Sequence, residues 1–206
     1  MQPGIYDLPR VALAAFSICS AGLLFATPAA AADQKFVITP VVEKKITQLP
    51  DGPLYWQVEN FPTLAEAEAA AGPTSLAADV EGKVWLFTLG AKGTPTHGGT
   101  MVVEVGPVTR ITAPEYLLRV NNAVAPAGTH TSTHTHPGSE AFYLLSGQLS
   151  QKTPRGVGVV EAGGTMPGLG PATTMEVSST GTTDLHALVM FVVDATQPFS
   201  SPAHFD

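Results

Sequence analysis

Two histidines and a glutamate lie close together in residues 128–147, which read GTHTSTHTHPGSEAFYLLSG. In an extended strand, side chains two residues apart point to the same face, so His134 and His136 present their imidazoles side by side. Residues 137–139 (PGS) then turn the chain, which lets Glu140 return a carboxylate toward the same point. Two imidazoles and a carboxylate on one face form a divalent metal site with coordination positions left open for a substrate or O₂.

This stretch resembles the first sequence motif of the cupin superfamily: a glycine, five residues, H-x-H, three or four residues, a glutamate, six residues and a glycine. Gly128, His134, His136, Glu140 and Gly147 stand at these positions. The resemblance implies a double-stranded β-helix, which is a jelly-roll barrel, with a divalent transition metal at its mouth. The metal is Cu, Fe, Mn, Ni or Zn, and its identity stays open.

The second cupin motif normally supplies a fourth ligand, a histidine, and here the chain departs from the family. The matching region, residues 164–181 (GTMPGLGPATTMEVSSTG), contains no histidine. Aligning residues 179–181 with the family's Asn-x-Gly turn puts Met175 at the histidine position, and Gly170 and Ala172 where proline and glycine usually stand. A thioether is a soft ligand that suits copper. Two interpretations stay open: Met175 ligates copper, or it is an apolar wall residue beside a three-ligand site.

Three other histidines are weaker candidates. His130 lies four residues before His134, roughly 13 Å along an extended strand, which is too far to bind the same ion. His186, in an apolar run, either faces the barrel interior as a replacement ligand or is a buried structural histidine bonded to backbone. His97 belongs to a polar, glycine-rich loop, so we expect it to be exposed.

The elements that must position the site are strands. Short Val/Leu/Thr-rich segments bounded by turn residues recur without intervening helices, which indicates an all-β sandwich or barrel. The predicted strands are residues 54–59, 76–80, 84–89, 101–105, 116–121, 129–136, 141–145, 148–153, 157–161, 175–178 and 185–194. The last is apolar on both faces, as in a strand that is covered on both sides. One short helix is predicted over residues 64–71, after the capping-box pair Thr63 and Glu66.

The first 32 residues have the pattern of a signal peptide. Arg10 precedes an apolar run (VALAAFSICSAGLLFA), and an alanine tract follows, which predicts cleavage after Ala32 and a periplasmic or secreted protein. An uncleaved membrane anchor is the alternative, but the run is shorter than the roughly 20 residues that a spanning helix needs. The only cysteine, Cys19, lies in this leader, so disulfides are excluded from the mature chain.

The sequence divides into the leader (residues 1–32), an N-terminal β extension (33–114), a cupin barrel core (115–195) and a C-terminal tail (196–206). Within the core, Phe142 and Leu144 share the strand face of Glu140 and are expected to line the pocket. The chain has a net charge of −7 and no run of Lys or Arg, which argues against nucleic acid and anionic membranes as partners.

Two functions are consistent with these observations. The first is an exported protein that binds a divalent metal and a small organic ligand without catalysis, which the missing fourth histidine favours. The alternative is a metal-dependent oxygenase of the quercetinase-like sort, which the intact first motif favours. Cupins often form dimers, so the resemblance leaves open that this chain forms a homodimer.

Overall fold

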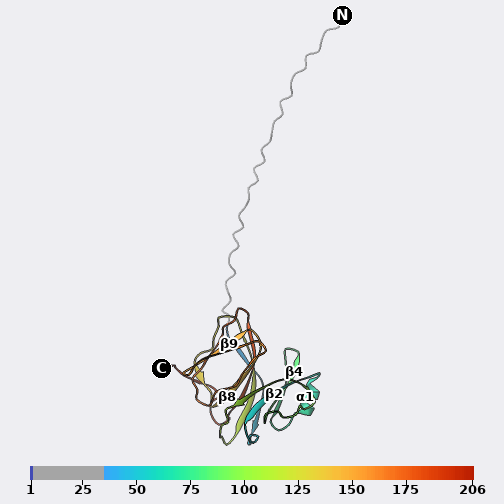
Figure 1. Cartoon of the computed structure of the whole chain (residues 1–206), viewed down its shortest axis with the longest axis vertical. Helices are drawn as coiled ribbons and strands as arrows, with labels where there is room; N and C mark the ends of the chain where they lie inside the picture. The colour runs from blue at the N-terminus through green and yellow to red at the C-terminus, as the bar shows by residue number, and fades with distance from the viewer. Residues whose placement is uncertain (2–34) are drawn as a thin grey trace. The chain divides into compact units, whose positions relative to one another are not determined.

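The computed structural model describes Met1 and residues 35–206 (Figure 1). The predicted leader and its cleavage site after Ala32 therefore lie outside the described residues. Within the described part of the chain, no helix combines the length and the apolar character needed to cross a membrane.

Two antiparallel sheets form the barrel. The first has the order β1-β6-β13-β8-β11. Its strands are β1 (Val37–Ile46), β6 (Tyr116–Ala125), β13 (Leu185–Asp194), β8 (Gly138–Ser146) and β11 (Thr165–Met166). The second has the order β10-β9-β12. Its strands are β10 (Gly156–Glu161), β9 (Gln148–Thr153) and β12 (Glu176–Ser179).

Residues 128–134 extend the second sheet beyond β12. Backbone hydrogen bonds join Gly128, Thr129 and Thr131 to β12 and its neighbours, and His134 exchanges both backbone bonds with Met175 at 2.9 Å. The short strand β7 (His134–Thr135) then pairs with β14 (Ser201–Pro202) in the C-terminal tail. The tail thus continues the second sheet past the edge that residues 128–134 would otherwise form.

The path of the chain identifies the barrel type. After β6, the chain changes sheet repeatedly. Residues 128–134, then β9 and β10, and then β12 lie in the second sheet. The strands that follow each of these three passages, β8, β11 and β13, lie in the first sheet. A chain that alternates between two facing sheets in this way winds as a double-stranded β-helix. The all-β jelly-roll barrel implied by the sequence motif is therefore confirmed.

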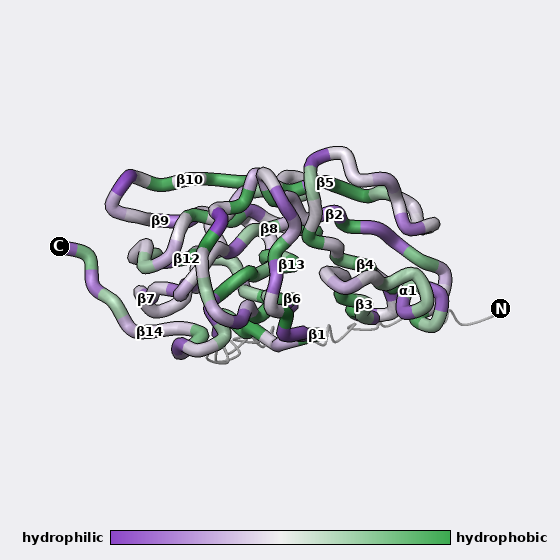
Figure 2. The backbone as a smooth tube through the Cα atoms, turned by 90° about the horizontal axis from the view of Figure 1, so that it is seen from below, coloured by the Kyte–Doolittle hydropathy of each residue, from purple (hydrophilic) through white to green (hydrophobic). Residues whose placement is uncertain are grey.

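A further sheet outside the barrel has four strands in the order β3-β4-β2-β5. Its strands are β3 (Ser75–Val80), β4 (Lys83–Gly90), β2 (Leu54–Phe61) and β5 (Thr100–Val108). Trp56, Trp85 and Phe87 of this sheet share one buried core with Leu118 and Met190 of the barrel. Figure 2 shows the consequence: β6, β13 and β8 lie between the β2–β5 sheet and the layer of β9, β10 and β12.

The central strand β13 of the first barrel sheet is therefore buried on both faces. On β13, Val189 and Phe191 belong to the core inside the barrel, whereas Leu188 and Met190 belong to the core shared with the β2–β5 sheet. Strands covered on both sides are apolar at every position rather than at alternate ones. The prediction that residues 185–194 are covered on both sides is confirmed.

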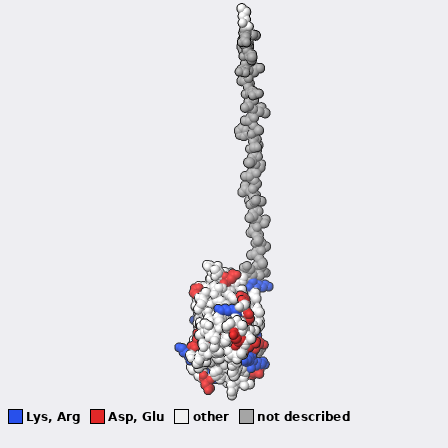
Figure 3. All heavy atoms as spheres, turned by 90° about the vertical axis from the view of Figure 1, so that its right-hand side faces the viewer, with Lys and Arg blue, Asp and Glu red and all other residues white. Residues whose placement is uncertain are grey.

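The helix α1 (Leu64–Ala70) carries the predicted capping box. Glu66 N donates to Thr63 Oγ1 at 3.3 Å, and Thr63 N donates to Glu66 Oε2 at 3.1 Å. Ala67 is its buried residue, so the helix is a small surface element beside β3 and β4 (Figure 2). On the face shown in Figure 3, acidic and basic side chains are interspersed.

Two sequence-based expectations need correction. No strand was predicted where β1 runs, because Pro40 and the charged residues 43–45 break its apolar pattern. It is an edge strand that pairs only with β6, and its backbone has a bulge after Pro40. Edge strands tolerate proline, charged residues and bulges. Conversely, the strand predicted over residues 129–136 is continuous only at His134–Thr135, with an isolated bridge at His130.

Candidate metal centre

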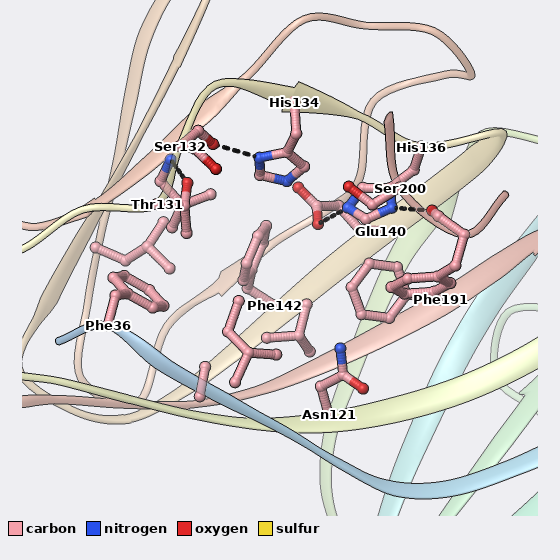
Figure 4. A pocket seen from close by; sticks show the side chains of 16 residues that line it. Phe36, Asn121, Thr131, Ser132, His134, His136, Glu140, Phe142, Phe191 and Ser200 are labelled. Carbon is pink, nitrogen blue, oxygen red and sulfur yellow. Dashed lines mark hydrogen bonds and ion pairs between the residues drawn. The ribbon is translucent and has the colours of Figure 1, made fainter. Parts of the chain in front are cut away.

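The structure brings together the three residues of the H-x-H…E pattern. One nitrogen of His134, one nitrogen of His136 and a carboxylate oxygen of Glu140 all lie within 4.8 Å of one another. His136 Nε2 is 3.6 Å from Glu140 Oε2, and the two imidazole centroids are 4.9 Å apart. Figure 4 shows these side chains converging at the upper end of a pocket. A metal ion of ordinary size would contact all three groups from one point between them.

The backbone around the site explains this convergence. The pairs with Met175 and with β14 hold β7 from both sides, which directs His134 inward. Gly138 then passes so close to β13 that a Cβ at this position would lie 2.5 Å from Val193 Cα. The glycine therefore lets β8 begin immediately after the turn, which carries Glu140 back beneath the histidines.

Both histidines have one ring nitrogen engaged by the backbone. His134 Nδ1 is 2.8 Å from Ser132 O, and His136 Nδ1 is 2.6 Å from Phe199 O. A carbonyl oxygen can only accept, so each Nδ1 carries the hydrogen and each Nε2 presents a lone pair. Metal-binding histidines are oriented in this way, with the second nitrogen donating to a carbonyl or carboxylate.

Burial sets the protonation of the two deeper groups. Desolvation lowers the pKa of His136 to about 4, although its bond to Phe199 opposes the shift. The ring is therefore neutral at pH 7, which is the form that binds metals. Desolvation also raises the pKa of Glu140 to about 8, against a hydrogen bond from Gln151 that lowers it. A divalent cation would favour the charged carboxylate.

Gln151 of β9 links Glu140 to Met175. Its Nε2 is 2.7 Å from Glu140 Oε1 and 3.5 Å from Met175 Sδ. Both Gln151 and Met175 are buried, at 3% and 1% exposure. The thioether therefore lies against the amide that holds Glu140, outside the lining of the cavity, and both interpretations of Met175 stay open.

The remaining histidines lie elsewhere. His186 Nε2 is 2.7 Å from Asn122 Oδ1 and 3.8 Å from Glu81 Oε1, so it faces away from the barrel interior and the replacement-ligand interpretation is wrong. His130 is largely exposed, near Glu176. His97 was expected to be an exposed loop residue, but its side chain is only 25% exposed because Nδ1 lies 2.9 Å from the buried carboxylate of Glu59.

A cavity of about 210 Å³ opens beside the three residues. Its lining is mostly apolar and aromatic and includes Phe199. Phe142 and Phe191 lie around its middle and Asn121 at the far end (Figure 4). Phe142 thus lines the pocket as expected. Leu144 is instead fully buried in the core inside the barrel, in the part that does not line the cavity.

Sequence reasoning missed Gln151, Asn121 and Phe199. Gln151 follows Leu149 at strand spacing, so its inward face could be inferred, but nothing in the sequence pairs it with Glu140. Phe199 acts through its backbone carbonyl, 63 positions from His136. Asn121 lies in a predicted strand where alternation alone does not indicate a cavity.

Ala172 has a left-handed backbone, with φ of 56°, where the second cupin motif carries glycine. Side chains other than glycine pay roughly 1–2 kcal/mol for this conformation. We therefore expect Ala172→Gly to raise the free energy of unfolding by about 0.5–1 kcal/mol, since part of that gain is lost to the freer unfolded chain. Urea denaturation would measure the change. Ala162→Gly, at an exposed turn residue without positive φ, is the control and should lower stability.

Comparisons with known proteins give partial likenesses. No protein-family profile matches the sequence, and no curated protein matches it. A cupin-like protein from Thermotoga maritima superposes with a TM-score of 0.37 at 13% identity, over 42% of this chain and 64% of its own. An uncharacterized conserved protein with a double-stranded β-helix domain from Klebsiella pneumoniae gives a TM-score of 0.37 at 19% identity, over 42% and 70%.

An RmlC-like cupin family protein with a double-stranded β-helix fold from Methanocaldococcus jannaschii gives a TM-score of 0.33 at 14% identity, over 35% of this chain and 67% of its own. This chain spans between 44% and 70% of the length of eight solved chains that it resembles. The likenesses cover less than half of this chain and say nothing of what it binds.

Proposed function

We propose that this chain, whose barrel has the double-stranded β-helix fold of the cupins, is an exported protein that binds one divalent transition metal through His134, His136 and Glu140. The observation that carries the proposal is the paired arrangement of the imidazoles. Each donates Nδ1–H to a backbone carbonyl, and each offers Nε2 toward the same carboxylate. Export is supported by the leader-like pattern of residues 1–32.

The donor set suits Cu, Fe, Mn, Ni or Zn, since two imidazoles and one carboxylate are borderline ligands that all these ions accept. A bound ion of this kind would supply Lewis acidity and open coordination positions. The protein's own residues do the rest: the backbone carbonyls orient the histidines, Gln151 orients Glu140, and the apolar cavity excludes most water from a small organic ligand.

The alternative function is a metal-dependent oxygenase acting on a small organic substrate. The observation that favours it is the cavity of about 210 Å³ beside the proposed ligands, which leaves room for a second reactant. Oxygen uptake by the fully metallated protein with a panel of flavonoids, diketones and thiols discriminates the two functions. Uptake above the metal-free background supports the oxygenase; its absence for the whole panel favours binding alone.

Elemental analysis tests the proposed metal site directly. Protein purified from its native compartment is expected to contain close to one equivalent of a transition metal per chain, and chelated protein should take up one equivalent on titration. A sample that carries no metal and binds none of the five candidate ions would contradict both functions.

The role of Met175 is tested in the same titration. Because its sulfur contacts Gln151, we expect Met175→Leu to leave copper affinity within about threefold of the wild type, as for a volume-conserving change in a wall residue. Met175→His, which restores the family's residue, should raise affinity for all the candidate ions. A large loss of copper affinity alone in the leucine variant would instead make Met175 a copper ligand.

A further inference from the structure

The deep end of the cavity carries an unused hydrogen-bond donor. Asn121 of β6 is 2% exposed, and its Oδ1 accepts a hydrogen bond from Arg119 Nε at 2.8 Å. Because a guanidinium can only donate, this bond fixes which end of the amide is oxygen. The amide nitrogen points into the pocket (Figure 4), where none of the described residues accepts a hydrogen bond from it.

The amide nitrogen is reached from the cavity, and polar groups in such a place usually have a ligand or a water as their hydrogen-bond partner. The walls near Asn121 leave little for water to bond. Ala123, Phe142, Val189 and Phe191 surround this part of the cavity. An apolar molecule with one carbonyl or ether oxygen would fill this space, and its oxygen would accept the hydrogen bond from the amide of Asn121.

The charges at the cavity argue against an anionic ligand. Its lining includes no Lys or Arg among the described residues. Arg119 does not line the cavity itself. It lies behind two lining residues, since its Nε bonds Asn121 Oδ1 and its guanidinium lies over the Phe199 ring at 4.3 Å. Its charge is shared with Glu43, 3.6 Å away. The buried polar residues of the lining are Asn121, His136 and Glu140. A carboxylate near Asn121 would lose its hydration, and the guanidinium behind the amide would compensate it poorly because that charge is already shared with Glu43.

The volume limits the size of the ligand. A dry engineered cavity of about 150 Å³ holds benzene, so the cavity of about 210 Å³ holds one ring with a short substituent. We propose that it binds a neutral, single-ring or similarly compact organic molecule whose hydrogen-bond acceptor meets Asn121 Nδ2. This deepens the proposed function and rests on it only for the end of the ligand that faces the metal.

The test uses the whole protein, as purified, after removal of metal by chelation, with acetophenone as the probe. Ethylbenzene has the same shape without the acceptor, and benzoate has a similar size with a negative charge. Ligand-observed NMR titration is expected to show binding of acetophenone and ethylbenzene, and benzoate at least about tenfold weaker, as for a poorly compensated buried charge.

Asn121→Leu removes the donor at similar volume. It is expected to reduce the ratio of acetophenone to ethylbenzene affinity by about fivefold, the size of one net hydrogen bond. Taking the ratio cancels the different hydration of the two probes. Asn121→Asp, which keeps the acceptor for Arg119, should reduce the ratio as well and serves if the leucine variant does not fold.

The cavity itself is tested by two adjacent residues of β6. Ala123→Leu fills the cavity and should abolish binding of both probes, whereas Val124→Leu, whose side chain points away and is 37% exposed, should leave it unchanged. An unchanged affinity ratio in both Asn121 variants, benzoate binding as well as acetophenone, or no binding of either neutral probe would overturn the inference. If His134, His136 and Glu140 do not bind a metal, the results with these probes stay the same, and only the metal titration reveals it.

Discussion

Replacing His136 with phenylalanine is expected to abolish tight metal binding while the barrel stays folded. The change removes the Nε2 lone pair that lies 3.6 Å from Glu140 Oε2. Loss of a residue that only orients a metal ligand typically reduces affinity about 10–100-fold, so loss of a ligand itself should exceed that range. Isothermal titration of the chelated protein with Zn²⁺ and Mn²⁺ would measure it.

The phenylalanine variant is chosen because the imidazole of His136 is packed among aromatic rings. Its centroid lies 5.0 Å from that of Phe191 and 4.9 Å from that of Phe199. A phenyl ring preserves this packing and loses one hydrogen bond, the one to Phe199 O, at a cost of about 1 kcal/mol. Because the pKa of His136 is already lowered to about 4, no charge is removed at pH 7.

His130→Phe is the matched control, since His130 lies on the same segment but its side chain is 60% exposed and outside the three-residue group. It should keep the wild-type affinity and stoichiometry. Should His136→Phe bind metal as tightly as this control, His136 would not be a ligand and the proposed site would be wrong.

Much of the site could be predicted from strand geometry. The two-residue period placed His134 and His136 on one face, and the short turn brought Glu140 to them. The structure also gives a physical reason for the glycines at the motif's ends: Gly128 and Gly147 have φ of 85° and 73°. At Gly147, a Cβ would also lie 2.7 Å from Asp184 O. These are conformations and approaches that other residues rarely tolerate.

The parts that could not be predicted depend on contacts between distant segments. Gln151 meets Glu140 because β9 belongs to the facing sheet, and Phe199 meets His136 because β14 pairs with β7. No periodicity within one strand encodes either contact. The tail over residues 196–206 was predicted only as a tail, yet its pairing with β7 makes it a wall of the site. The strand β1 escaped prediction for a similar reason, since its pairing with β6, rather than its own pattern, holds it in the sheet.

Gly168→Ala is expected to damage both the fold and the site, through a single methyl group. The β11–β8 pairing matches Thr165 with Tyr143 and Met166 with Phe142, so the same register continued by two residues sets Gly168 opposite Glu140. The approach there is very close. A Cβ on Gly168 would overlap the carbonyl oxygen of Glu140 and lie 2.6 Å from its backbone nitrogen.

The clash cannot be relieved by rotating a side chain, because the atoms it meets are backbone. Either the segment after β11 or the backbone of Glu140 must move. Overpacking of a core usually costs about 1–3 kcal/mol, and a backbone overlap belongs at the upper end, so we expect a loss of about 3 kcal/mol in the free energy of unfolding. Metal affinity should fall with it, since the displaced residue is a proposed ligand.

Gly170→Ala, two residues further on, separates this steric effect from the general effect of adding alanine. Neither glycine has positive φ, and a Cβ on Gly170 would meet only the side chain of Thr109, at 3.2 Å. Alanine has less conformational entropy than glycine in the unfolded chain, which stabilises the fold by about 0.4–1 kcal/mol and should offset that mild contact. Urea denaturation and metal titration of both variants provide the measurement. Equal stability and affinity in the two would show that Gly168 does not brace Glu140, and that the carboxylate is held by Gln151 and the β8–β13 pairing alone.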